Sequence, residues 1–251
     1  MSKLASRIRK ALRTEASPMG FAAAASSKPS PTMLLLARFS ADQADKAVEA
    51  VRQGADVLLF EGDVARLRGK IKEMEDTPAG VFMEALSSDA LTSLKEAGVD
   101  FVVFKAETTA AEALLDEQCG FVLALEPNPS DTVLRILKDL PLDALVLASV
   151  GQPLTVQRQL ELRRMALLSQ IPLLVEVPSS LTAAHLRSLR DAETVGVIVE
   201  GAAAMGRLAE LRQAIDGLPP RSRRGREERP DAMLPAATPV VAGGEEEEED
   251  E

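Results

Sequence analysis

The chain of 251 residues is poor in the side chains that build redox, zinc and base-stacking sites. It has one cysteine, Cys119, one histidine, His185, and no tryptophan or tyrosine. A single cysteine excludes a disulfide framework and is typical of a reducing cytoplasm, where we expect the protein. The pair is too small for a His/Cys zinc site, and neither residue lies in a catalytic motif. No G-x-G-x-x-G fingerprint predicts a flavin or NAD cofactor.

Long apolar runs are also missing. No stretch approaches the roughly 18 apolar residues of a membrane span, and the first residues lack the apolar core of a signal peptide. Seven of the ten net negative charges lie in residues 245–251, which leaves −3 for the rest of the chain. Five arginines at 221–229 suggest phosphate contacts, but Glu227 and Glu228 interrupt them and no Trp or Tyr is present for stacking. We therefore expect no nucleic-acid partner.

The two ends differ from the middle of the chain. Near the start, Leu4, Ile8 and Leu12 recur at helical spacing among basic residues, which predicts an amphipathic helix. It is either a membrane-surface or partner-binding helix, or a helix packed on the outside or bottom of the domain; three apolar residues favour the second. We divide the chain into a helix and connector at 1–31, a folded domain at 32–217, and a disordered Pro/Arg-rich linker and acidic tail at 218–251.

The middle of the chain is a repeat. Eight short apolar runs, each followed by a segment with helical spacing, occupy residues 33–39, 56–60, 80–83, 100–104, 120–125, 143–148, 172–175 and 195–199. Apolar runs without alternation indicate strands that are buried on both faces, as in a parallel sheet. Eight such units predict an α/β fold that closes into a (β/α)8 barrel.

A polar residue directly follows each run, except that Arg38 lies inside the first run, and successive polar residues are 21 to 27 residues apart. These eight ring residues are Arg38, Glu61, Glu84, Lys105, Glu126, Ser149, Glu176 and Glu200. They are predicted to meet at the C-terminal mouth of the barrel. The residues two positions earlier are predicted to fill the interior: Leu36, Leu59, Phe82, Val103, Ala124, Leu147, Leu174 and Ile198.

With its units in register, the chain resembles the aldolase-type TIM barrels, which include class I aldolases and ribulose-phosphate-binding enzymes of amino-acid biosynthesis. The resemblance covers about residues 33–216 and is architectural, without a family-specific catalytic motif. It implies a compact barrel with its active site at the C-terminal mouth. The Schiff-base lysine of the aldolases ends strand six, where this chain has Ser149, whereas Lys105 ends strand four.

The predicted ring has two cations and five carboxylates, a formal charge of −3. In a functional interpretation, Glu61, Glu126 and Glu176 are general acids or bases. Lys105 and Arg38 complete the predicted catalytic set. Lys105 is then an electrophile or a Schiff-base amine. Glu126 and Glu176 are candidate oxygen ligands of Mg²⁺ or Mn²⁺. In a structural interpretation, the ring is an ionic layer that closes the mouth. The carboxylate excess argues against a purely structural layer.

Further ligand contacts are predicted at the mouth. A phosphate in these barrels is held by backbone N–H groups after strands seven and eight, where Ser179, Ser180 and Gly201 lie here. The alternative, which we favour, is that Ser179 or Ser180 caps a helix that starts near Thr182. Ring members Glu84, Ser149 and Glu200 complete the predicted ligand contacts.

Two functions fit these patterns. The first is a lyase- or isomerase-like enzyme that acts on a small carboxylated or phosphorylated metabolite through the ring. The second is a non-catalytic barrel that binds or organises partners through its charged ends. A cavity that reaches Glu61, Glu126 and Glu176 favours the first, and a ring closed by mutual ion pairs favours the second. The expected partner is a small molecule, and the sequence leaves a homo-oligomer open.

Overall fold

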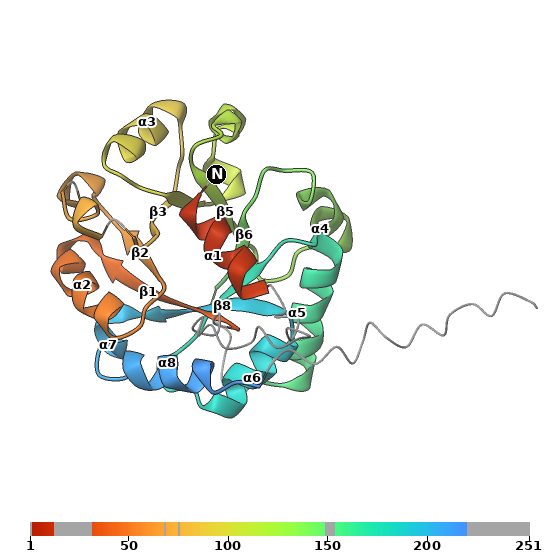
Figure 1. The fold of residues 1–251 in the computed structure, drawn as a ribbon. Helices are drawn as coiled ribbons and strands as arrows, with labels where there is room; N and C mark the ends of the chain where they lie inside the picture. The colour runs from red at the N-terminus through yellow and green to blue at the C-terminus, as the bar shows by residue number, and fades with distance from the viewer. Residues whose placement is uncertain (1, 13–31, 68, 75, 149–153, 220–251) are drawn as a thin grey trace, which may run out of the picture. The chain divides into compact units, whose positions relative to one another are not determined.

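A computed structural model describes residues 2–12, 32–67, 69–74, 76–148 and 154–219. Eight parallel strands pair in chain order, and the eighth pairs with the first to close a barrel (Figure 1). They are β1 Leu34–Ser40, β2 Val57–Glu61, β3 Ala79–Met83, β4 Phe101–Phe104, β5 Gly120–Leu125, β6 Ala144–Leu147, β7 Leu173–Glu176 and β8 Thr194–Glu200. Each predicted run is a strand, so the predicted (β/α)8 fold is confirmed. The predicted connector from residue 13 and the tail from residue 220 lie outside the described residues.

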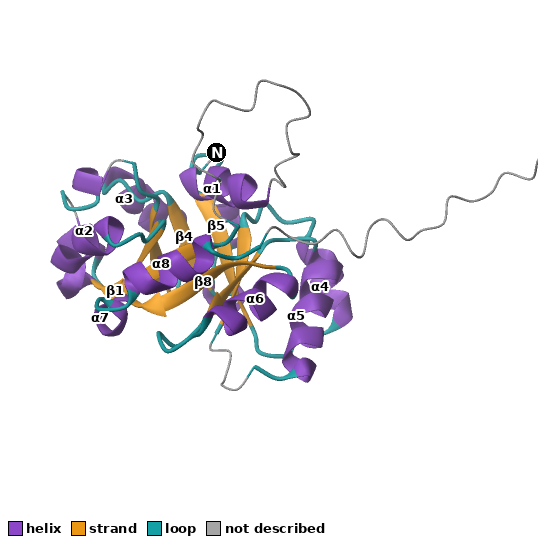
Figure 2. Cartoon of the chain, turned by 60° about the horizontal axis from the view of Figure 1, so that its bottom comes forward, coloured by secondary structure: helices purple, strands orange, loops and turns teal. Residues whose placement is uncertain are grey.

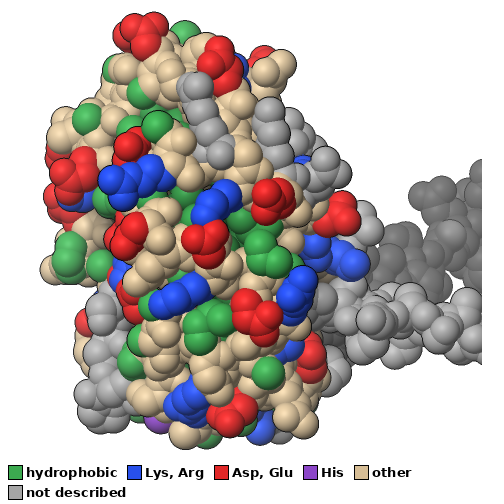
Figure 3. All heavy atoms as spheres, turned by 90° about the vertical axis from the view of Figure 1, so that its left-hand side faces the viewer, with side chains coloured by type: hydrophobic (Ala, Val, Ile, Leu, Met, Phe, Trp, Pro, Cys, Tyr) green, Lys and Arg blue, Asp and Glu red, His purple; other side chains and the backbone are tan. Residues whose placement is uncertain are grey.

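The helices surround the barrel, apart from α1 at one end. They are α1 Lys3–Leu12, α2 Ala44–Arg52, α3 Ser88–Glu96, α4 Asp131–Leu137, α5 Val156–Ser169, α6 Ala183–Asp191, α7 Gly201–Ala204 and α8 Leu208–Asp216. Within the described residues, none of these helices is long and apolar enough to cross a membrane. Acidic and basic side chains are interspersed over the side of the molecule shown in Figure 3.

The described residues of two connections form no α-helix, although one is predicted there. The described residues between β2 and β3 form the 3-10 helices η2 Val64–Leu67 and η3 Lys72–Met74, and those between β4 and β5 form η4 Ala106–Thr108 and η5 Ala111–Leu115. Gly69, with φ of 89°, interrupts right-handed helix in the first. In the second, Thr109 is extended and bridges to Leu86. The α-helices predicted after β2 and β4 were therefore wrong for the described residues.

Alternate strand residues fill the barrel interior. They include Leu36, Leu59, Val103, Leu174 and Ile198, with Phe82 and Ala124 packed against them. Gly80 leaves room for the Phe101 ring, because a Cβ there would lie 2.3 Å from it. The prediction was wrong at strand six, where Ala144 and Val146 belong to the interior cluster and Leu147 to the outer one. The phase of this strand differs by one residue from the predicted phase, because its apolar run continues to Ala148 past the end of β6.

Helix α1 closes the N-terminal end of the barrel, which is the end where the strands begin (Figure 2). Its residues Leu4, Ile8 and Ala11 are buried in the interior cluster. At its start, Asp100 accepts hydrogen bonds from the N–H groups of Lys3 and Leu4 at 2.7 and 2.9 Å. The apolar face of the predicted amphipathic helix is therefore used inside the protein, and the helix packs at the bottom of the domain.

Acidic residues that precede the strands accept hydrogen bonds that hold the N-terminal end of the barrel together. The Ser2 hydroxyl donates to Asp143 at 2.6 Å, and Ser2 Oγ accepts the N–H of Ala5 as a helix cap. Before β2, Asp56 accepts from Arg212 of α8 at 2.7 Å and from the N–H of Leu35. These contacts join the first helix, the last helix and the sheet at one end of the barrel.

We expect Asp100→Ala to lower the free energy of unfolding by about 1–2 kcal/mol, because two N–H groups at the start of α1 lose a charged acceptor. Asp100→Asn should lose less, since an amide oxygen can accept one bond. Denaturant unfolding measures both losses. The exposed Asp139→Ala is the control and should change stability by less than about 0.5 kcal/mol. An equal effect of Asp100→Ala and Asp139→Ala would contradict this role.

The pKa of Asp143 predicts a pH dependence. Burial raises this pKa above the usual aspartate range, the Ser2 hydrogen bond opposes the rise, and nearby Asp100 adds to it. The folded state therefore keeps the proton to higher pH than the unfolded state, and this residue lowers stability as pH rises through the raised pKa. Relative to wild type, Asp143→Asn should gain stability as the pH rises from about 4, near the ordinary aspartate pKa, through the raised pKa, and the difference should then level off. Urea unfolding across this range tests it, and a difference that stays constant or shrinks with pH contradicts it.

Candidate functional site

The mouth of the barrel holds the polar residues that the repeat predicts. Glu61, Glu176 and Glu200 are the last residues of β2, β7 and β8. Glu84, Lys105 and Glu126 directly follow β3, β4 and β5. Arg38 lies within β1, opposite Glu200 in the register of β8. Parallel strands thus carry these seven side chains to one end of the barrel, above its apolar interior.

Arg38 is the centre of the best-defined part of the mouth. Its guanidinium donates a hydrogen bond of 2.7 Å to Glu176 Oε1. Glu61 and Glu200 each lie 3.5 Å from a guanidinium nitrogen. The side chains of Arg38 and Glu176 are 26% and 23% exposed, so this contact is the least hydrated of the three. We call these four residues the Arg38 cluster; three carboxylates from three strands share one cation.

Lys105 makes a looser arrangement. Its ammonium lies 3.4 Å from Glu84 Oε1 and 5.8 Å from the centre of the Phe82 ring. The side chain is 46% exposed, so water still reaches the ammonium. Thr108 donates its hydroxyl hydrogen to the Glu84 carbonyl and holds the segment after β4 against the segment after β3. The carboxylate that contacts Lys105 is thus Glu84, which directly follows the neighbouring strand β3.

Glu126 is exposed, and no ion pair joins it to another described residue. Its proposed fellow metal ligand, Glu176, is engaged by Arg38. Among the described residues, no group of three or more His, Cys, Asp or Glu side chains is arranged to hold a metal ion. The structure therefore brings Glu176 into the Arg38 cluster and leaves Glu126 at the rim.

The segment after β7 is organised by a cap that the sequence analysis missed. Thr182 is the N-cap of α6; it accepts the N–H of His185, and the His185 ring bonds back to Thr182. The prediction that Ser179 or Ser180 caps this helix was wrong. Thr182 and His185 have the three-residue spacing of a capping box, with His in place of the usual Glu or Gln. The single histidine is thus part of a helix cap.

Packing accounts for the glycine at position 201. A Cβ on Gly201 would lie 2.3 Å from the Phe39 ring, so glycine allows α7 to pack close to β1. Ser149 lies outside the described residues. Burial raises the pKa of the Cys119 thiol to about 12, which keeps it protonated at neutral pH.

Two cavities lie away from the mouth. One, of about 260 Å³, is bordered by Lys3, Lys95 and Asp100 at the base of β4. The other, of about 550 Å³, lies between α2 and η3. Neither is lined by Glu61, Glu126 or Glu176.

The chain matches no protein-family model and no curated protein by sequence. It is similar in structure to the alpha subunit of tryptophan synthase from Legionella pneumophila, with 16% identity over 87% of this chain and all of that chain and a TM-score of 0.65. It is also similar to dihydropteroate synthase from Xanthomonas albilineans, with 14% identity, coverage of 74% and 94%, and a TM-score of 0.53. An Aquifex aeolicus protein gives 11% identity, coverage of 86% and 98%, and a TM-score of 0.62. These likenesses show the fold: the chain is a TIM barrel.

Proposed function

We propose that the mouth binds a small polar metabolite and performs lyase- or isomerase-type chemistry with its carboxylates as acid and base. The observation that carries the proposal is the unequal environment of these carboxylates. Glu176 is three-quarters buried and hydrogen-bonded to Arg38, whereas Glu126 is exposed. In enzymes, different environments give the carboxylates of one site different pKa values, and this difference decides which one acts as acid and which as base.

The proposed roles follow from the contacts. Arg38 is a positioning residue, because its bonds hold Glu176 at the mouth beside Glu61. Glu61, Glu126 and Glu176 are the candidate acids and bases. Lys105, with Glu84 as its ion-pair partner at 3.4 Å, is better placed than Arg38 to attract a carboxylate or phosphate of the ligand. Glu200, Ser179, Ser180 and Gly201 would border the same ligand.

The similar structures support a small-molecule ligand. The Xanthomonas dihydropteroate synthase was solved in complex with 7,8-dihydropteroate. A structurally similar protein from Pyrococcus furiosus belongs to a tryptophan synthase complex. Barrels of this architecture thus include one that binds a small ligand and one that assembles with a protein partner. We assign the small ligand of this chain to the mouth.

One observation favours a non-catalytic barrel as the second candidate. Arg38 already has three carboxylate neighbours within 3.5 Å, as expected of an ionic layer that closes the mouth. In that case the ring stabilises the barrel, and partners bind elsewhere on the chain. The two candidates differ in whether the mouth binds and converts a small molecule.

Thermal unfolding with phosphorylated and carboxylated metabolites, Mg²⁺ and Mn²⁺ tests the first candidate. We expect one metabolite, with or without a cation, to raise the wild-type midpoint by several degrees at a hundredfold excess over its Kd. Lys105→Met and Glu126→Gln should reduce this shift, whereas the exposed Lys138→Met should not. The stabilising metabolite should also be converted, as mass spectrometry would detect. No wild-type shift, or a shift unaffected by both mouth variants, contradicts the proposal.

Stability measurements separate the two cations of the mouth. Arg38→Met should lower the free energy of unfolding by about 1–2 kcal/mol at neutral pH, because Glu176 loses its donor and three carboxylates repel one another. Lys105→Met should cost less than about 0.5 kcal/mol, since its ion pair is exposed. Equal losses for the two variants would show that the Arg38 cluster has no special part in stability.

A further inference from the structure

The two halves of the mouth differ in how tightly they are closed. On β7, β8, β1 and β2, the Arg38 cluster joins four ring residues by contacts of 2.7 and 3.5 Å. On β3, β4 and β5, Lys105 contacts Glu84 at 3.4 Å, and no ion pair joins Glu126 to another described residue. We call the ring positions of β3 to β6 the open half of the mouth.

The interior residues beneath the ring show the same division. Phe82 on β3 and Ala124 on β5 are partly exposed, although they pack against the interior cluster. The interior side chains at the same level of the other strands are at most 5% exposed: Leu36, Leu59, Val103, Val146, Leu174 and Ile198. Water therefore reaches the interior in the open half, whereas the interior beneath the Arg38 cluster is closed.

Small side chains contribute to this opening. Ala124 is an alanine in a row where the other strands have Leu, Phe, Val or Ile. On β6, Ala144 and Val146 face the interior, so alternation places Ala148 at the ring position of this strand. Ala148 is exposed and has no polar side-chain group. The neighbouring strands β5 and β6 therefore leave room beside Glu126 for part of a ligand.

The charge of the mouth favours a cationic ligand. In the open half, Lys105 and Glu84 balance each other, and Glu126 adds one negative charge. The Arg38 cluster has three carboxylates and one cation, which adds −2 on the other side of the mouth. A cation is therefore attracted to the mouth and an anion is repelled. The exposed part of the Phe82 ring suits an apolar or aromatic body.

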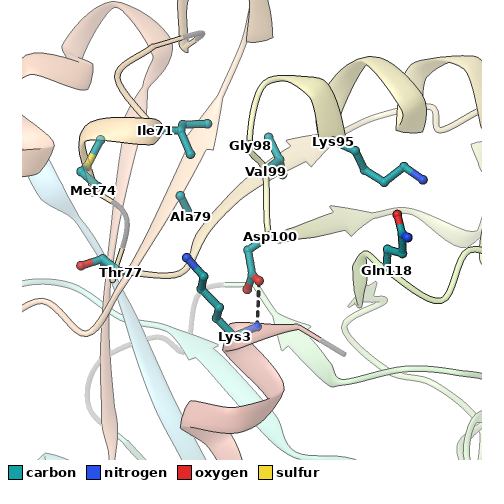
Figure 4. Close-up of a pocket in the computed structure, with 10 residues that line it drawn as sticks. All are labelled: Lys3, Ile71, Met74, Thr77, Ala79, Lys95, Gly98, Val99, Asp100 and Gln118. Atoms are coloured by element: carbon teal, nitrogen blue, oxygen red, sulfur yellow. Dashed lines mark hydrogen bonds between the residues drawn. The ribbon is translucent and has the colours of Figure 1, made fainter.

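The cavity at the base of β4 differs in this respect. Figure 4 shows its Asp100 carboxylate hydrogen-bonded to the N–H of Lys3. Lys95, which also lines this cavity, pairs with Asp116. The Lys3 side of the cavity is engaged within the protein as well. The charges around this cavity therefore select no ligand, whereas the carboxylate of Glu126 at the mouth is exposed to one.

We propose that the ligand of the mouth is a small amine with an apolar body, held in the open half. Its ammonium lies against the Glu126 carboxylate, and its apolar body lies over Phe82 and Ala124. The Arg38 cluster faces the ligand from the other side of the mouth and does not hold the ammonium. This inference rests on the proposed function, and it specifies the class of substrate and its position within that site.

Calorimetric titration of the full chain tests the charge preference. The probe is phenethylamine, with phenethyl alcohol and hydrocinnamate as its uncharged and anionic analogues and ethylamine as the amine without a ring. We expect phenethylamine to bind at least about fivefold more tightly than each of the other three, as one exposed ion pair and one apolar contact would give.

Matched substitutions locate the ammonium and the apolar body. Glu126→Gln should weaken phenethylamine binding about fivefold. Glu200→Gln removes the same charge from the Arg38 cluster and should weaken it less than about twofold, because water and salt screen a charge on the other side of the mouth. Ala124→Leu should abolish binding by filling the floor of the open half, and denaturant unfolding shows whether this variant keeps its fold.

Several outcomes would overturn the inference. They are no binding of phenethylamine to the wild type, equally tight binding of hydrocinnamate, equal effects of Glu126→Gln and Glu200→Gln, and full binding to a folded Ala124→Leu. The metabolite panel judges the proposed function separately. A panel metabolite that is bound and converted while phenethylamine does not bind refutes the amine and leaves the proposed function in place. If neither the panel nor phenethylamine binds, both fail.

Discussion

Closure of the sheet by the pairing of β1 with β8 is the constraint on which the rest of the structure depends. The register runs from Leu34 opposite Gly196 to Arg38 opposite Glu200. A closed barrel has no unpaired strand edge, and its interior must be filled by side chains. Gly80 and Gly196 leave space for these side chains. A Cβ at Gly80 would collide with Phe101, and a Cβ at Gly196 would collide with Leu174.

Different residues cover the two ends of the barrel. At the N-terminal end, the apolar face of α1 continues the interior cluster, and Asp100, Asp143 and Asp56 satisfy the groups around it. At the C-terminal end, the interior gives way to carboxylates, Arg38 and Lys105. The base therefore serves stability, and the mouth carries the groups that can do chemistry.

At the mouth, charge balance decides which residues form a unit. Arg38 takes Glu176 as its hydrogen-bond partner and has Glu61 and Glu200 at 3.5 Å, whereas Lys105 reaches Glu84. Strand neighbours could be paired from the repeat, because closure puts Arg38 between β8 and β2. The bond to Glu176 could not, because it reaches past β8 to the end of β7 and joins residues 138 positions apart in the chain. Side-chain length and the filling of the mouth decide such a contact.

The sequence by itself determined the eight strands, their parallel order and the ring phase at seven of eight strands, because continuous apolar runs and a regular polar residue survive without tertiary information. It also specified α1 as an amphipathic helix. The tertiary structure alone decided what covers the apolar face of α1, which carboxylates share Arg38, and that two connections form 3-10 helices. It also decided that Val146, and not Leu147, points inward. Each depends on contacts between segments far apart in the chain, and local propensity and spacing contain no information about those contacts.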